Sequence, residues 1–359
     1  MSMSKQKIVD IDDSEDVIEN VVPPADIFAF NESRSCADLK RMYDKKQIDI
    51  SPNFQREQVW KSPAKARFLD SLLKNLPIPS MCISLDISTQ KRVVIDGLQR
   101  ISTIVEFLDA VEHDKDLVLS LLDDIDERLS GKSIKQIKQE NPEVIGFIEN
   151  VSIPVTVLRC DLSRQDHMEY IFTIFHRLNT GGTKLNNQEI RNCIFNGNFN
   201  DLLFECSLLK SEELESLLGK NSSRFFFEEF ILRFFAFQDD FSSYTGRLTS
   251  FLNNYMEKNR YLSKDEISMK KELFINAIDI LYSKSEKNNR PSKVILESLL
   301  YGIGKNLEHL NSKPINEFRT LYQRILEEGS FHSSELQGGL MKYNKVRDRF
   351  DSVCKIFSK

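Results

Sequence analysis

The sequence lacks most features that mark membrane, secreted or metal-binding proteins. No uncharged apolar run approaches the roughly 18 residues that a membrane-spanning helix needs. The N-terminus has no basic segment followed by an apolar core, which argues against a signal peptide. The six cysteines are scattered without a C-x-x-C pair, which argues against a zinc site and predicts reduced thiols in a cytoplasmic protein. The five histidines show no paired metal-ligand spacing.

The chain also lacks a global positive charge. Its formal net charge is -5, so any contact with nucleic acid must be local. Residues 40–74 form a local exception, with nine Lys or Arg against four Asp or Glu. A solvated helix face explains most such runs, but this one precedes the candidate site described below.

Three familiar catalytic or metal-binding patterns are incomplete, absent or better explained in another way. The run Gly131-Lys132-Ser133 resembles the end of a phosphate-binding Walker loop, but the required first glycine would fall at Asp126 and no strand precedes it. No G-x-S-x-G nucleophile elbow occurs. The acidic cluster at 123–127 has carboxylates that could bind a divalent metal, although a solvated helix face is the commoner meaning of such runs.

Length and pattern predict more than one domain. The 359 residues suffice for two domains, and 40% hydrophobic with 29% charged residues is typical of soluble globular proteins. We predict an acidic disordered tail at 1–25, an α+β domain at 26–198 and an all-helical domain at 199–359. The predicted elements are a helix at 36–48, a helix capped by Ser62-Pro63, strands at 81–87 and 92–95, a helical region at 109–150, a strand at 151–158 that Pro154 places at a sheet edge, a helix burying Met168, Ile171, Phe172 and Phe175, a central apolar helix at 225–235, and helices at 294–307 and 315–326.

The stretch from Val93 to Thr103 organises the first domain. An apolar β-branched run predicts a strand that breaks at the turn dipeptide Asp96-Gly97. Thr103 and Glu106 have capping-box spacing, which places a helix start nearby. A strand, a polar turn and a helix start together direct backbone N–H groups toward one spot, which suits an anion such as phosphate.

A second polar loop follows a later helix. The run Asn179-Thr180-Gly181-Gly182 is a typical helix stop, and Asn186 with Glu189 predicts that a new helix begins. An ordinary helix–loop–helix explains this pattern. A second glycine loop facing the first is the functional interpretation.

Several separated sequence blocks, given at the end of this paragraph, are similar to the N-terminal domain of GmrSD-type restriction systems. They also occur in the same order as in that domain. The similarity covers roughly residues 35–195. The turn has Leu98 where glutamine is common, a mild departure from the family's Asp-Gly-Gln-Gln-Arg motif. The blocks are Phe54-Gln55-Arg56 with Trp60, Leu76-Pro77-Ile78-Pro79, Ile95 to Arg100 with Ser102-Thr103, Phe175 with Arg177 to Gly182, and Leu185 with Glu189-Ile190.

The resemblance implies a ParB/sulfiredoxin-like mixed sheet with helices, followed by a helical domain. It also implies that the turn lies in a nucleotide-phosphate pocket of an NTPase or NTP-dependent nuclease that defends against phage. Full-length members often carry a C-terminal HNH nuclease domain with a His and Asn signature. We find no such signature here, so the expectation does not extend to DNA cleavage by this chain alone.

With this resemblance, we predict cytoplasmic NTP hydrolysis in a prokaryotic defence system. Asp96, Gln99 and Arg100 are the predicted catalytic residues. Arg100 would pair phosphate oxygens bidentately, Asp96 would hold Mg²⁺ or position water, and Gln99 would orient the attacking water. Gly97 would admit the phosphate to the backbone, and Ser102 and Thr103 would donate from the helix start. The predicted nucleotide contacts are Gln55, Arg56, Gly97, Arg100, Ser102, Thr103, Asn179, Gly181 and Gly182.

Two alternatives remain open. One is a ParB-like DNA nuclease that uses the same turn, which the basic excess at 40–74 favours. The other is a non-enzymatic regulator that binds nucleotide or DNA while a separately encoded nuclease cuts. In that case the helical domain would dock the partner or a second copy of the chain. Neither alternative involves a membrane.

Overall fold

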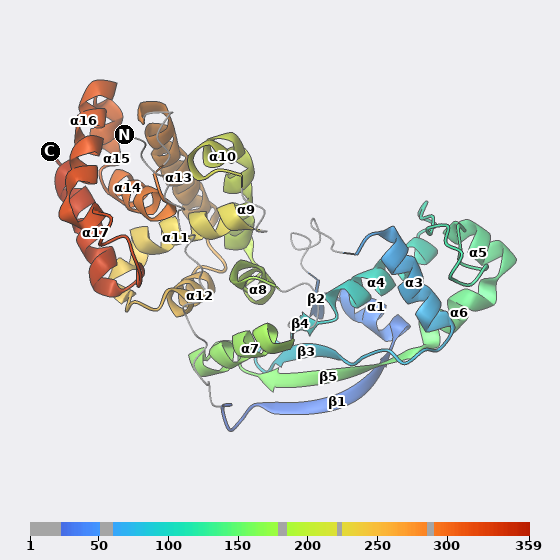
Figure 1. The fold of residues 1–359 in the computed structure, drawn as a ribbon. Coiled ribbons are helices and arrows are strands. Elements are labelled where there is room, and N and C mark those ends of the chain that lie inside the picture. Colours follow the sequence, from blue (N-terminus) through green and yellow to red (C-terminus); the bar gives the residue numbers. More distant parts are fainter. Residues whose placement is uncertain (1–22, 51–59, 179–184, 221–224, 286–290) are drawn as a thin grey trace. The chain divides into compact units, whose positions relative to one another are not determined.

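The computed structural model describes residues 23–50, 60–178, 185–220, 225–285 and 291–359 (Figure 1). Within these ranges the chain divides into two compact units. The sheet unit contains residues 23–186 and 192–194, and the helical unit contains 187–191 and 195–359. No helix of the described ranges is long and apolar enough to cross a membrane.

The sheet unit is built on five strands in the order β1-β5-β3-β4-β2. The pairs β1–β5 and β3–β4 are antiparallel, whereas β5–β3 and β4–β2 are parallel. This mixed sheet, followed by a helical region, confirms the predicted α+β class. The strands are β1 (Phe28–Ser35), β2 (Ile48–Asp49), β3 (Met81–Asp86), β4 (Arg92–Asp96) and β5 (Ser152–Cys160).

Two expectations about the sheet were wrong. The strand with Pro154 is not at an edge, because β5 lies between β1 and β3 (Figure 1). Proline is tolerated there because β3 pairs with β5 only from Met81↔Val155 onward, so Pro154 precedes that ladder. The edge strand β1 was not predicted, since most of its residues are exposed and it has no buried apolar face to detect.

Within the described ranges, six helices accompany the sheet. The helices α1, α3, α4 and α6 pack on one another around one apolar core, and α7 packs against β4. The cap of α3 is Lys61 rather than the predicted Ser62, so Pro63 lies in the first turn. The helices are α1 (Cys36–Asp44), α3 (Ser62–Leu73), α4 (Leu98–Glu112), α5 (Ile134–Glu140), α6 (Pro142–Asn150) and α7 (Gln165–Leu178).

The acidic region at 109–150 is helical only in part. Residues 113–133 form turns rather than a helix, and they are held by an isolated bridge between Val118 and Ser133. Two carboxylates of the acidic cluster, those of Asp124 and Asp126, have cationic partners. Asp124 accepts from Arg67 at 2.7 Å, and the carboxylate of Asp126 pairs with Arg128 at 2.8 Å.

The ion pair of Asp126 predicts an acid sensitivity of the sheet unit. Hydrogen bonds from Arg128 lower the pKa of this carboxyl to about 2, whereas an unfolded aspartate titrates near about 3.9. The contribution is therefore fully present above about pH 4 and is lost as pH falls through about 2. We expect the Asp126→Asn variant to show a smaller loss of unfolding free energy between these pH values, measured by urea unfolding. An unchanged pH dependence would contradict this assignment.

The helical unit contains only helices among its described residues. As predicted, the apolar helix α11 (Phe226–Asp240) is central, and Phe234 and Phe235 contact Phe274 of α13 with ring centroids 5.5 and 6.1 Å apart. The other helices are α8 (Asn187–Ile194), α9 (Asn198–Leu209), α10 (Ser211–Leu218), η3 (Phe241–Ser243), α12 (Leu248–Lys258), α13 (Lys264–Lys284), α14 (Lys293–Lys305), α15 (Leu307–Ser312), α16 (Ile315–Glu327), η4 (Gly329–Phe331) and α17 (Tyr343–Phe357).

Candidate functional site

The predicted strand–turn–helix element is present. Strand β4 ends at Asp96, Gly97 adopts the left-handed conformation with φ 94° and ψ 13°, and α4 begins at Leu98. The first helical bond joins the Ile101 N–H to the Gly97 carbonyl at 3.0 Å. Among the described residues, no side chain caps this helix start. The N–H groups of the first turn, which have no partner inside a helix, therefore remain as donors for an anion.

Gly97 is required for two separate reasons. Its positive φ is a conformation that side-chain-bearing residues rarely adopt. A Cβ atom built at this position would lie 2.6 Å from Cγ of Met81, a fully buried residue at the start of β3. The turn thus packs its backbone directly against the neighbouring strand.

Arg100 connects the turn to a second motif block. Its Nη2 donates to Oδ2 of Asp96 at 2.7 Å, and its Nη1 donates to the carbonyl of Pro79. The Arg100 side chain is 13% exposed and that of Asp96 is 38% exposed. A guanidinium carries five N–H groups, so these two bonds leave donors for a phosphate.

Gln99 connects the turn to a third block. Its Oε1 accepts a hydrogen bond from the backbone N–H of Trp60 at 3.3 Å. The Trp60 ring contacts Phe68 of α3 edge-on, with the ring centroids 5.5 Å apart. The structure therefore brings together three motif blocks that are separated in the sequence. The sequence marked Trp60 and Pro79 as motif residues, but it gave no sign that their backbone atoms hold the turn.

The predicted positions of Ser102 and Thr103 at the helix start were wrong. Because α4 begins at Leu98, both residues lie inside the helix, where they are 8% and 2% exposed. The Thr103 hydroxyl donates to the Gln99 carbonyl one turn earlier at 2.7 Å. Glu106, the predicted capping partner, instead pairs with Lys65 at 2.6 Å. The capping-box spacing was misleading because a left-handed glycine starts this helix without a side-chain cap.

The remaining predicted contacts lie outside the described residues. These are Gln55, Arg56, Asn179, Gly181 and Gly182, so their roles stay predictions. The helix before the second loop, α7, ends at Leu178 with the expected apolar face buried. Glu189 and Arg191, after that loop, are buried in the helical unit, and Nε of Arg191 donates to Asn253 at 2.9 Å.

Asp96 is the candidate metal ligand at the turn. Among the described residues no three His, Cys, Asp or Glu side chains gather as a metal site. Mg²⁺ commonly uses one or two carboxylates together with substrate phosphates and waters, so a single half-exposed aspartate fits this ion only together with a bound phosphate. Cys82 faces Asp96 across the sheet, but burial and then the Asp96 charge raise the pKa of its thiol to about 12. A thiol with so high a pKa carries little thiolate near neutral pH.

Fold and site together define an α+β domain with an uncapped helix start beside an arginine–carboxylate pair. Residues 39–196 match the family described as the GmrSD restriction endonuclease, N-terminal domain. This match covers less than half of the 359 residues and agrees with the similarity of the separated sequence blocks to that domain. Comparisons with curated proteins and with solved structures find no match.

Proposed function

We propose that the sheet unit binds a nucleoside triphosphate at the Asp96–Arg100 turn and hydrolyses it within a prokaryotic restriction system. The main support for this proposal is the uncapped start of α4, where the left-handed Gly97 directly follows β4. Such a helix start offers backbone donors and a positive dipole end to phosphate oxygens.

The neighbouring side chains supply the other parts that phosphoryl transfer needs. Arg100 retains unused N–H groups that would stabilise charge on the phosphoryl oxygens. It also fixes the Asp96 carboxylate, whose other oxygen would bind Mg²⁺, the ion that neutralises phosphate charge. Gln99 is held by Trp60 through its oxygen, so its amide nitrogen would contact the attacking water or a phosphate.

A thermal-shift screen of ATP, GTP, CTP and UTP with Mg²⁺ is the first test. A ligand that binds only the native state at about 100 times its Kd adds about 2.7 kcal/mol of stability. We expect one nucleotide to raise the unfolding temperature and to be hydrolysed when DNA is present. The proposal fails if no nucleotide shifts the transition and none is turned over.

A nucleotide-binding regulator is the second candidate. The observation that favours it is that Asp96, Gln99 and Arg100 all have hydrogen bonds within the domain, which makes the turn a rigid binding element. This candidate predicts a thermal shift without turnover. Measuring released phosphate under the conditions of the shift distinguishes the two candidates.

A further inference from the structure

A strongly basic pocket lies in the sheet unit, apart from the Asp96–Arg100 turn. Its volume is about 520 Å³, and the five cations that line it are Arg34, Arg41, Lys46, Lys91 and Arg92. None of its described lining residues is acidic. We infer that this basic pocket binds the sugar-phosphate backbone of DNA. The inference deepens the proposed function, because a restriction-type protein acts on DNA.

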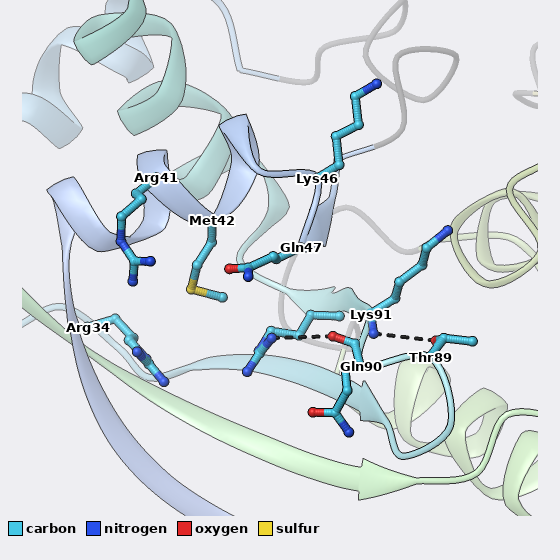
Figure 2. Close-up of a pocket in the computed structure, with 9 residues that line it drawn as sticks. Arg34, Arg41, Met42, Lys46, Gln47, Thr89, Gln90 and Lys91 are labelled. Atoms are coloured by element: carbon cyan, nitrogen blue, oxygen red, sulfur yellow. Dashed lines mark hydrogen bonds between the residues drawn. The ribbon is translucent and has the colours of Figure 1, made fainter.

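The cations come from segments that the fold brings together. Arg34 lies next to the last residue of β1 and Arg41 lies on α1, whereas Lys46 lies in the turn after α1. Lys91 and Arg92 lie where the β3–β4 turn enters β4. Figure 2 shows the Lys46 and Lys91 side chains extending in the same direction, away from Arg34 and Arg41.

Hydrogen bonds fix both turns that carry the lysines. Lys46 has φ 54°, and its N–H donates to the Tyr43 carbonyl at 2.8 Å. In the other turn, the buried Asp86 carboxylate accepts from the N–H groups of Thr89 and Leu162 at 3.2 and 3.3 Å. The ammonium groups therefore extend from fixed backbone positions, which lowers the entropic cost of binding.

The positive charge of the pocket is only partly compensated. Arg34 pairs with Glu32 at 2.8 Å and Arg41 pairs with Asp38 at 3.0 Å. Lys46, Lys91 and Arg92 form no salt bridge with any carboxylate of the described ranges. The pocket thus keeps a positive surplus within a chain whose net charge is -5, and this surplus attracts a polyanion.

Arg92 has unused donor capacity inside the pocket. Its Nε is buried without a hydrogen-bond partner among the described residues, and its Nη1 makes only a 3.4 Å bond to the Gln90 carbonyl. A buried donor without a partner is unfavourable. Arg92 lines the pocket, so a phosphate oxygen there would accept hydrogen bonds from the other N–H groups of this guanidinium.

The remaining lining favours a phosphate backbone over a free nucleotide. No aromatic ring lines the described pocket, and Met42 is its only apolar side chain. A base therefore finds no stacking surface here. Separated lysine and arginine charges instead match successive backbone phosphates, which set affinity without reading sequence. Arg92 begins the same strand that ends at Asp96, about 13 Å away at roughly 3.3 Å per residue.

The test is DNA binding by a double variant of the full chain without nucleotide. Lys46→Gly removes one cation at a position where glycine is favoured, and Lys91→Ala removes an exposed one. The matched control is Lys220→Ala with Lys355→Ala, two exposed lysines outside the pocket. Fluorescence anisotropy with a short labelled duplex is measured across salt concentrations.

We expect the pocket variant to bind at least about 10-fold more weakly near 0.1 M salt, with a log–log salt slope shallower by about 2. The control is expected to match the wild type. The inference is overturned if the pocket variant keeps the wild-type affinity and slope, or if the wild type binds no duplex. A third result would also overturn it. If the pocket variant binds DNA normally but is no longer stabilised by inorganic phosphate or nucleotide, the pocket binds a small phosphate ligand and not DNA.

This outcome is separable from that of the proposed function. The double variant leaves every residue of the Asp96–Arg100 turn intact, so the thermal shift that nucleotide and Mg²⁺ produce without DNA should persist. Conversely, a failure of nucleotide binding at the turn leaves the anisotropy result unaffected.

Discussion

Replacing Arg100 with alanine is expected to lower nucleotide turnover by about 10²–10³-fold, the usual loss when one preorganised donor to a charged transition state is removed. The change deletes the guanidinium beside the helix start and both bonds that it makes, to Asp96 and to the Pro79 carbonyl. The measurement is kcat with the nucleotide identified by thermal shift, with Mg²⁺ and DNA present.

Two companion variants separate chemistry from structure. Arg100→Lys keeps the charge but loses the planar fork, so we expect weaker but detectable turnover. Arg347→Ala removes an exposed arginine of the helical unit and should leave turnover unchanged. Thermal unfolding of each variant shows whether the domain is intact. Turnover by a folded Arg100→Ala variant at the wild-type rate would exclude a catalytic role for this residue.

The turn itself could be predicted from the sequence, but its connections could not. The apolar run before Asp96 and the helical spacing after it specify a strand, a break and a helix. These are local features, and the structure has them all. The bonds from Gln99 to Trp60 and from Arg100 to Pro79 join residues 39 and 21 positions apart. They depend on how α3 and β3 are placed, which no local pattern encodes.

The errors have a common physical origin. The Thr103–Glu106 spacing predicted a cap, but the conformational freedom of Gly97 sets the actual helix start. Pro154 predicted an edge strand, but the neighbouring ladder begins one residue later. In both cases the conformational preference of a residue type suggested the wrong structure. The backbone geometry, which depends on the neighbouring helix or strand, determined the actual one.

The basic pocket was only partly visible in the sequence. The excess of Lys and Arg at 40–74 includes Arg41 and Lys46, which line the pocket. Arg34, Lys91 and Arg92 fall outside that stretch and reach the pocket through β1 and the β3–β4 turn. Counting charges along the sequence could not show that these five residues line one pocket. They come together only because the chain runs from β1 through α1 to β2 in the folded domain.

Gly97→Ala is expected to destabilise the sheet unit by about 2–5 kcal/mol. A side chain at φ 94° is strained, at a cost of about 1–2 kcal/mol in the left-handed region. The Cβ atom would also lie 2.6 Å from Cγ of Met81, and overpacking a core adds about 1–3 kcal/mol. Trp60 is the only tryptophan in the chain and lies in this unit, so its fluorescence during urea unfolding reports on this unit.

Gly146→Ala provides the matched control. Gly146 lies inside α6 with no atom within 4 Å of an added Cβ, so alanine there should be neutral or stabilise by about 1 kcal/mol. Combining Gly97→Ala with Met81→Ala distinguishes backbone strain at Gly97 from the close contact with Met81. If the contact dominates, the double variant is more stable than the sum of the single changes predicts; if backbone strain dominates, the effects add. An unfolding midpoint of Gly97→Ala equal to that of the wild type would show that the turn does not need glycine, and the close backbone approach proposed for phosphate binding would lose its basis.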